Sequence, residues 1–257
     1  MTISTTDRRL HITKQIEQNE QVDVALLSKQ FEVSEVTIRK DLKYLEKNNI
    51  LIRTRGGAIK QRVINTDLPI LERRKKNVHY KKNIGKLAAG LIEDGETILL
   101  DSGTTIMELA KNISKGIEIT IITNAIDIAY QLTEYTNIKV IVPGGFLRRN
   151  SISLVGEQAA ETLRNYHFDK CFLSVDGIDA EKGLLTNNLE EAHLSRIAIH
   201  NSKEVILLAD SSKFGNNAVL SIAPLRAIHT IITDENISAE HQGLFRKEKI
   251  KTLIAKS

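Results

Sequence analysis

The stretch 33-VSEVTIRKDLKYLEKNNILIRTRGGA-58 decides the architecture of the N-terminal third of the chain. Its apolar residues Ile38, Leu42 and Leu45 follow one another at helical spacing, which predicts a helix with one buried face. Ser34 stands just before that helix and is a candidate N-cap. Two short β-prone runs around a Gly-Gly pair follow, a pattern typical of a β-hairpin.

Two further helices are predicted upstream of this stretch. Apolar residues at i, i+3 and i+7 indicate a helix over 24–31, with Asp23 as its N-cap. A break at 32–33 separates that helix from the one described above, and such a pair is typical of a helix-turn-helix. The stretch 7–16 carries two isoleucines four residues apart and supplies a third helix to close the core.

The outer face of the second helix of this pair is suited to DNA, because the N-terminal part of that helix meets base edges in helix-turn-helix proteins. Arg39 can bond guanine through two hydrogen bonds, whereas Lys40 and Lys43 are better suited to phosphates. The residues of this helix and its tip that we predict to contact DNA are Ser34, Val36, Thr37, Arg39, Lys40 and Lys43.

The hairpin 50-ILIRTRGGAIKQR-62 is predicted to form a basic wing. Arg53 and Arg55 lie beside its turn, where they would enter an adjacent groove or contact phosphates. Gly56 and Gly57 would let the backbone approach the DNA closely.

The residues from Val33 to Ala58 resemble the winged-helix signature of the DeoR family of bacterial transcriptional regulators, V-S-x-x-T-I-R-R-D-L-x-x-L followed by Gly-Gly-Ala. The resemblance implies sequence-specific binding to operator DNA. Lys40 departs from the signature, which has a second Arg there; the charge is kept, but a lysine does not read a base through two parallel bonds.

Composition and charge narrow the class of protein. The 257 residues, with 41% hydrophobic and 26% charged, exclude collagen-like, disordered and disulfide-stapled proteins. Residues 1–86 carry a charge of +9 and residues 87–257 carry −5, an asymmetry that indicates a nucleic-acid partner for the N-terminal part only.

Cys171, the single cysteine, is predicted to be a buried strand residue. Without a signal-peptide pattern or a membrane-length apolar run, we expect a cytoplasmic protein with no membrane partner.

We expect three segments: a winged helix-turn-helix domain over 1–62, a linker over 63–83 and an α/β domain over 84–257. The basic run 72–82 within the linker favours a solvated connector, and the alternative is a run in which Arg73, Arg74, Lys75 and Lys76 contact phosphates. In the α/β domain, short β-branched runs alternate with helical stretches, which predicts a mostly parallel sheet with helices on its faces. These runs occupy residues 97–101, 119–123, 138–142, 171–175, 204–209 and 229–233.

Ligands of such sheets bind beyond the carboxyl ends of the strands, so the residues that follow each run are candidates for a site. The loop 102–105 opens a helix and would hold an anion through backbone N–H groups, hydroxyls and the helix dipole. It lacks the Gly-Lys pattern of a nucleotide-binding P-loop, so ATP hydrolysis is not implied. The histidines are scattered, without metal-ligand spacing, so we expect no metal and no cofactor.

The C-terminal half also resembles the DeoR family, through DSGTT at 101–105, TN at 123–124, GG at 144–145, SLVG at 153–156, VDGID at 175–179, EA at 191–192 and ADSSKFG at 209–215. This implies a sensor domain similar to ribose-5-phosphate isomerase that binds a phosphorylated sugar. The implied phosphate-binding residues are Ser102, Gly103, Thr104, Thr105 and Lys213. The implied sugar-binding residues are Asp101, Asn124, Arg148, Asp176, Asp179, Glu190 and Glu191. Within the family, 164–179 and 37–47 look nearest to the AgaR type, which regulates amino-sugar catabolism.

The expected function is therefore a repressor of a sugar or amino-sugar operon, acting as a dimer or tetramer and released by a phosphorylated sugar, with no catalytic residues. The alternative is a sugar-phosphate isomerase-like enzyme with a DNA-binding appendage, which needs a carboxylate base such as Glu190 or Glu191. The isomerases carry three consecutive glycines after an Asp-Gly-Ala-Asp motif, and 180-AEKGLLTNN-188 has none. A third class, a DNA-binding protein without a ligand, fits poorly with the polar loops at the strand ends.

Overall fold

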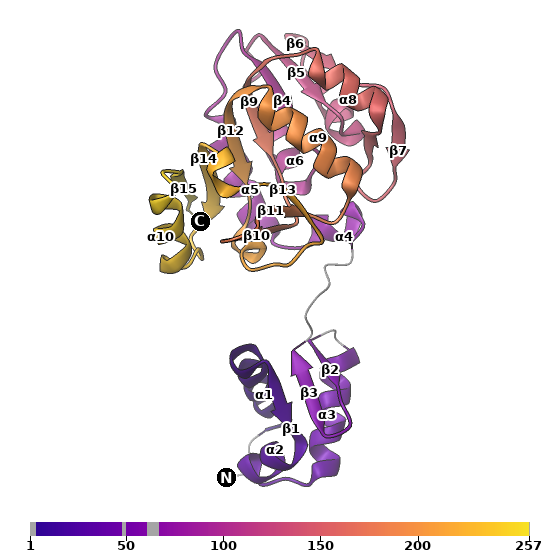
Figure 1. Cartoon of the computed structure of the whole chain (residues 1–257), viewed down its shortest axis with the longest axis vertical. Helices are drawn as coiled ribbons and strands as arrows, with labels where there is room; N and C mark the ends of the chain where they lie inside the picture. The colour runs from indigo at the N-terminus through magenta and orange to yellow at the C-terminus, as the bar shows by residue number, and fades with distance from the viewer. Residues whose placement is uncertain (1–3, 48–49, 61–66, 257) are drawn as a thin grey trace. The chain divides into compact units, whose positions relative to one another are not determined.

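The computed structural model describes residues 4–47, 50–60 and 67–256, which belong to two compact units, 1–63 and 64–257 (Figure 1). Each unit has a hydrophobic core of its own. The last two residues of the predicted wing and the first four of the predicted linker lie outside the described residues. No helix within the described ranges is both long and apolar enough to cross a membrane.

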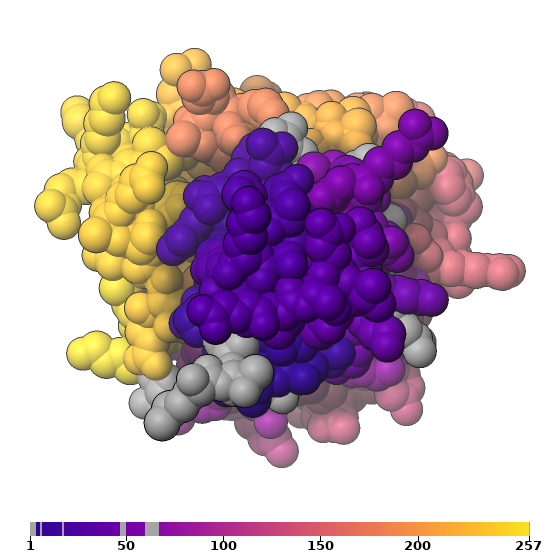
Figure 2. All heavy atoms as spheres, turned by 90° about the horizontal axis from the view of Figure 1, so that it is seen from below, coloured from indigo at the N-terminus to yellow at the C-terminus, as the bar shows by residue number. Residues whose placement is uncertain are grey.

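The first unit combines three helices with a small antiparallel sheet, and Figure 2 shows it as one closely packed body in indigo and violet. Its helices are α1 (Thr5–Asn19), α2 (Val24–Phe31) and α3 (Glu35–Lys47). Its strands are β1 (Gln21–Asp23), β2 (Leu51–Arg53) and β3 (Gly57–Lys60), in the order β1-β3-β2. The helices and the hairpin confirm the prediction. Strand β1 was not predicted, because three residues give no periodic signal.

Side-chain caps produce the break between α2 and α3. Asp23 accepts hydrogen bonds from the backbone N–H groups of Ala25 at 2.8 Å and Leu26 at 3.1 Å. Glu32 ends α2 in the left-handed conformation, with φ of +52°. The Ser34 hydroxyl then accepts a bond from the N–H of Thr37 at 3.3 Å and starts α3. Both predicted N-caps are confirmed.

A buried ion cluster fixes α3 on α1. Asp41 is 1% exposed and accepts hydrogen bonds from Arg8 Nε at 2.6 Å and Arg9 Nε at 2.7 Å. The Arg9 guanidinium also lies 3.8 Å from the centre of the Tyr44 ring. Asp41 therefore holds α3 against α1, because its removal would leave the buried Arg8 guanidinium without an acidic partner.

The second unit is built on a seven-stranded parallel sheet with helices on both faces (Figure 1). In the order β15-β14-β12-β9-β4-β5-β6, the strands are Lys251–Ala255, Thr230–Asp234, Ser202–Leu208, Phe168–Leu173, Thr97–Leu100, Ile119–Thr123 and Ile138–Ile141. The predicted parallel sheet is confirmed for six strands. The edge strand β15 was not predicted.

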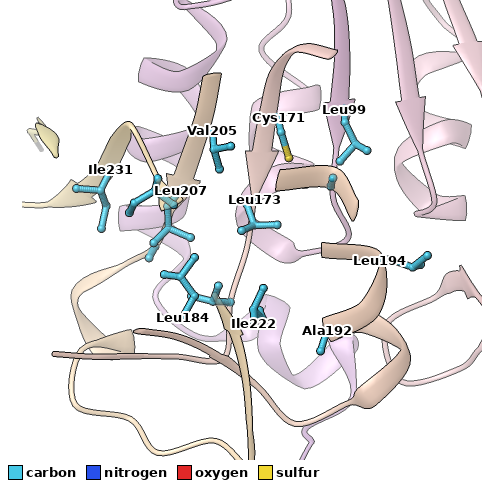
Figure 3. Packing of buried hydrophobic residues seen from close by; sticks show 14 of the residues in the cluster. Leu99, Cys171, Leu173, Leu184, Ala192, Leu194, Val205, Leu207, Ile222 and Ile231 are labelled. Atoms are coloured by element: carbon cyan, nitrogen blue, oxygen red, sulfur yellow. The ribbon is translucent and has the colours of Figure 1, made fainter. Parts of the chain in front are cut away.

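Alternate residues of each central strand point to opposite faces of the sheet and divide its core in two. Ile98 and Leu100 of β4 pack with α5 (Val78–Ala89), α6 (Thr104–Ala110) and α7 (Ile126–Leu132). Leu99 packs on the other face with Cys171 and Leu173 of β9, as Figure 3 shows. That face is covered by α8 (Glu157–Arg164), α9 (Leu189–His200) and α10 (Ala239–Lys247). Cys171 is fully buried, as predicted, and burial raises the pKa of its thiol.

Two small antiparallel sheets complete the second unit at the ends of the strands. One pairs β7 (Phe146–Arg148) with β8 (Ser153–Val155). The other has the order β10-β11-β13 and contains Gly177–Asp179, Gly183–Thr186 and Leu220–Ala223. The loop after β12 forms one turn of 3-10 helix, Ser211–Lys213.

The predicted linker over 63–83 is wrong from residue 67 onward, because this segment is part of the second unit. Helix α4 (Ile70–Lys75) follows Pro69 as its N-cap residue, and Ile70 is 1% exposed, with its N–H bonded to Asn150 O at 2.7 Å. Helix α5 packs on α6 through the fully buried Ile84. The isoleucines on either side of the basic run dock these helices, so the run does not form a solvated connector.

Candidate functional site

Helix α3 presents the predicted recognition residues on its solvent face. Ser34, Val36, Arg39, Lys40 and Lys43 are exposed, and Thr37 is half-buried. Arg39 is held along the helix by an ion pair with Glu35 one turn earlier, at 2.7 Å, in which both side chains are about half exposed. An exposed pair of this kind is weak, so Arg39 is free to exchange Glu35 for a base or a phosphate.

The wing places its basic residues at the surface, with one exception to the prediction. Arg53, Arg55 and Gly56 are exposed, whereas Gly57 is buried against strand β1. A Cβ atom on Gly57 would lie 1.9 Å from the carbonyl oxygen of Val22. Gly57 is therefore needed for the close approach of β1 and β3, and its predicted role in approaching DNA is corrected.

A cavity of about 130 Å³ opens at the carboxyl end of the parallel sheet. Four cationic side chains contribute to its walls: Arg73, Lys76, Lys81 and Lys213. The polar side chains around them are Asn77, Thr104, Thr105, Ser174, Asp176, Asn187, Asp210, Ser212 and Asn216. The cavity thus combines an excess of positive charge with hydroxyl, amide and carboxylate groups, the set that a phosphorylated polyol requires.

Lys213 is the cation of this cavity that follows strand β12, and its ammonium group has no hydrogen bond or ion pair within the described parts of the chain. Burial lowers the pKa of Lys213, and the nearby Asp176 and Asp210 act in the opposite direction. The side chain of Lys213 is half-buried, so an anion bound in the cavity would have its ammonium available as a partner.

Lys81 connects the cavity to helix α4. Its ammonium donates hydrogen bonds to the carbonyl oxygens of Arg73 and Lys76, both at 2.7 Å, and so caps the C-terminal end of α4. Burial lowers the pKa of Lys81 to about 8, which places its loss of charge close to the physiological range.

A smaller chamber of about 20 Å³ adjoins the cavity and is lined by three acidic residues, Asp101, Asp176 and Glu191. Burial raises the pKa of Asp101 to about 7, although its carboxylate accepts bonds from the N–H groups of Ser102 at 2.7 Å and Ser174 at 3.2 Å. Burial also raises the pKa of Glu191. When ionised, these carboxyl groups can accept hydrogen bonds from the hydroxyls of a ligand, and when protonated they can also donate to them.

Four of the predicted sugar-binding residues do not line either chamber, and three of them have partners elsewhere in the fold. Asn124 is buried and donates to the carbonyl oxygen of Leu154 at 3.2 Å. Asp179 caps the turn between β10 and β11 by accepting bonds from two backbone N–H groups. Arg148 binds Glu191 at 2.8 Å and also Asp67. Arg148 therefore positions Glu191 and does not itself line either chamber.

The remaining residue of this group, Glu190, lies beside Glu191 on α9 but outside the lining of both chambers. Of the predicted phosphate loop, Thr104 and Thr105 line the cavity and Ser102 lines the smaller chamber. Gly103 is buried, and a Cβ atom there would lie 2.8 Å from the Ser174 hydroxyl. No group of acidic, histidine or cysteine residues suited to a metal occurs in the described ranges.

Sequence reasoning missed the contribution of α4 and α5 to the cavity. Arg73, Lys76 and Lys81 come from the basic run, for which the sequence favours a solvated connector over phosphate contacts and gives no sign of a place in the sensor cavity. The available signal was the apolar Ile70 and Ile84 at the ends of that run, which mark docked helices. Asn187 was also missed, because it belongs to a turn without a recognisable motif.

Two family profiles match the chain. One, described as a DeoR-like helix-turn-helix domain, matches residues 8–62, and the other, a DeoR C terminal sensor domain, matches residues 76–235. The chain belongs to the DeoR family. It is a DNA-binding transcriptional regulator in which the first unit carries the helix-turn-helix and the second is the sensor domain.

Relatives in this family match almost the full length of the chain. A protein of Escherichia coli O157:H7 named "Putative aga operon transcriptional repressor" is 37% identical over 97% of this chain and 94% of its own length. The HTH-type transcriptional repressor GlcR of Bacillus subtilis is 34% identical, over 96% of this chain and 95% of its own. Among solved structures, the ribose 5-phosphate isomerase of Methanocaldococcus jannaschii is a distant match, with 18% identity and a TM-score of 0.41 over 55% of this chain and 56% of its own.

Proposed function

We propose that this DeoR-family regulator represses a sugar or amino-sugar catabolic operon and is released from its operator by a phosphorylated sugar. The observation that carries the proposal is the cavity at the sheet edge, where the ammonium of Lys213 lacks a partner in the described structure beside a set of hydroxyl, amide and carboxylate groups. The names of the relatives, which include an aga operon repressor, support the sugar-catabolic assignment.

Each part of the ligand has candidate partners. The phosphate would lie against Lys213, Thr104 and Thr105, because cations and hydroxyls are its preferred partners. The sugar hydroxyls would bond Asp176 and Asn187, and Asp101 at the deeper end. The ligand shifts the protein between two states only by binding the DNA-incompetent state more tightly, so effector affinity and operator affinity are linked.

The DNA-binding unit would act as a pair, because two winged helices on a repeated or palindromic operator bind more tightly than one. Arg39 would read a base, and Lys40, Lys43, Arg53 and Arg55 would contact phosphates. We propose a homo-oligomer on this ground, and sedimentation of the full chain with and without DNA tests it.

The direct experiment measures binding of the full chain to the DNA upstream of its own gene in a gel-shift titration. The titration is repeated with a panel of pentose, hexose and amino-sugar phosphates, with the unphosphorylated sugars as matched controls. We expect at least one phosphate to lower operator affinity by tenfold or more and its sugar to have no effect. An operator affinity that no member of the panel changes contradicts the proposal.

We propose further that the cavity binds its ligand without turning it over. The isomerase alternative needs Glu190 or Glu191 as a base, and of these Glu191 lines the smaller chamber together with Asp101. A turnover assay of the same panel distinguishes the two functions, since sustained conversion at enzyme-like rates would contradict a sensor that only binds.

A further inference from the structure

Helix α4 inserts an arginine into the sensor cavity in an arrangement that leaves the guanidinium only partly satisfied. Arg73 lines both the cavity and the smaller chamber. Its only ion-pair contact within the described ranges is long, 3.5 Å from Nη1 to Asp176 Oδ1. Its Nε is buried and has no hydrogen-bond partner there. An unsatisfied buried donor of this kind costs free energy that a bound acceptor would recover.

Asp176, in contrast, does not depend on Arg73. Its Oδ2 accepts hydrogen bonds from the backbone N–H of Asn187 at 3.0 Å and from the Thr186 hydroxyl at 3.2 Å. If Arg73 turned to another anion, the Asp176 carboxylate would keep these partners. The Arg73–Asp176 contact is thus the weak one of the set, and a phosphate offers Arg73 two parallel hydrogen bonds in its place.

The position of Arg73 in the chain gives this exchange a consequence. Helix α4 is the first helix of the sensor domain, and only nine residues separate its start at Ile70 from the end of β3 at Lys60. The helix is anchored on its other side by Arg74, which pairs with Asp127, and at its C-terminal end by Lys81. A change in the position of Arg73 would therefore displace α4, the first helix after the DNA-binding unit in the chain.

We propose that Arg73 binds the phosphate monoester of the effector in exchange for Asp176, and that α4 thereby transmits occupancy of the cavity to the DNA-binding domain. The identity of the effector rests on the proposed function, whereas the contact between Arg73 and a phosphate group does not depend on it. Arg73 thus contributes both to binding and to release, whereas Lys213 contributes to binding alone.

The experiment tests the phosphate contact of Arg73 by using inorganic phosphate as the probe. Calorimetric titration at constant ionic strength compares the full-length wild type with Arg73→Gln, Arg73→Lys, Asp176→Asn and Lys75→Gln. Lys75 is the matched control, because it lies on the same helix, is 72% exposed and pairs only with Glu72 in the described structure. We expect Arg73→Gln to weaken phosphate binding at least tenfold, Arg73→Lys to retain part of it and Lys75→Gln to match the wild type.

Asp176→Asn gives a result of opposite sign. It removes the competing carboxylate, so phosphate should bind more tightly than to the wild type, although the same variant should bind a sugar phosphate less tightly. The inference is overturned if the wild type binds no phosphate, or if Arg73→Gln binds phosphate as the wild type does. These results are independent of operator release, so they are distinguishable from a failure of the whole panel of sugar phosphates to change DNA binding.

Discussion

At the scale of single residues, Arg39 and Lys43 lie one turn apart on the exposed face of α3 and should differ in what they read. Arg39→Ala should weaken operator binding by roughly 1–3 kcal/mol and relax the preference at one base pair, because a bidentate contact is lost. Lys43→Gln should weaken binding to all sequences alike and reduce the salt slope by about one. Binding to a library of single-base operator variants at two salt concentrations measures both effects. An unchanged base preference in Arg39→Ala would assign Arg39 to the phosphate contacts.

Lys81 should make effector binding depend on pH. Its folded-state pKa of about 8 lies below the ordinary value of 10.5, so the ammonium loses its proton as the pH rises through 8. A sugar phosphate with a second pKa near 6 remains a dianion above pH 7, so only the protein changes charge in this range. We expect effector affinity to fall by roughly threefold to tenfold between pH 7 and 9.

Lys81→Met should lower the affinity at pH 7 and make its fall between pH 8 and 9 shallower, because the cation is absent throughout and Asp101, with a pKa of about 7, is by then largely ionised. Lys82→Met is the neighbouring control, since its exposed side chain lies outside the described cavity. Wild-type affinity that stays constant from pH 7 to 9 would refute the role assigned to the Lys81 charge.

At the scale of elements, the wing depends on a single glycine. Gly57→Ala would place a methyl group 1.9 Å from the Val22 carbonyl oxygen and should separate β1 from β3, at a cost of roughly 1–3 kcal/mol. Gly56→Ala is the matched control, because its methyl group would meet Asp23 only at 3.9 Å. Hydrogen exchange of the β1 and β3 amides in the full chain should increase in Gly57→Ala alone. Equal exchange in the two variants would contradict this account of Gly57.

The elements that the sequence predicted are those with a periodic signal. The spacing of Ile38, Leu42 and Leu45 located α3, and the β-branched runs located six of the seven parallel strands. Two of the elements that the sequence did not predict have a clear physical reason. Strand β1 is too short to show a period, and α4 has only six residues, four of them charged, so its single buried residue Ile70 was hidden in a basic run.

The same reasons explain which site residues could be predicted. Lys213, Thr104 and Asp176 follow parallel strands, and the topology brings such residues to one sheet edge. Arg73 and Lys81 reach that edge from outside the strand order, so no strand-end rule finds them. Asp179, conversely, is the last residue of β10 and caps the turn that follows, because a carboxylate next to free N–H groups bonds locally.

At the scale of the whole molecule, the boundary between the two compact units changes how the net charge is divided along the chain. Divided at residue 86, the chain has a basic arm of +9 and a body of −5. Divided between the two compact units, residues 1–63 carry +4 and residues 64–257 are neutral. The difference is the basic run of α4 and α5, part of which lines the sensor cavity. Under the proposed function, the charge asymmetry therefore reflects both DNA and an anionic effector.

The central claim is that one chain links operator DNA to a phosphate-bearing effector. The most direct test measures operator affinity of the wild type and of Lys213→Ala by titration, with and without the sugar phosphate that most stabilises the protein against heat. We expect equal operator affinity for both proteins without ligand, a fall of tenfold or more for the wild type with ligand, and little change for Lys213→Ala. An operator affinity of the wild type that the bound sugar phosphate leaves unchanged would contradict the claim.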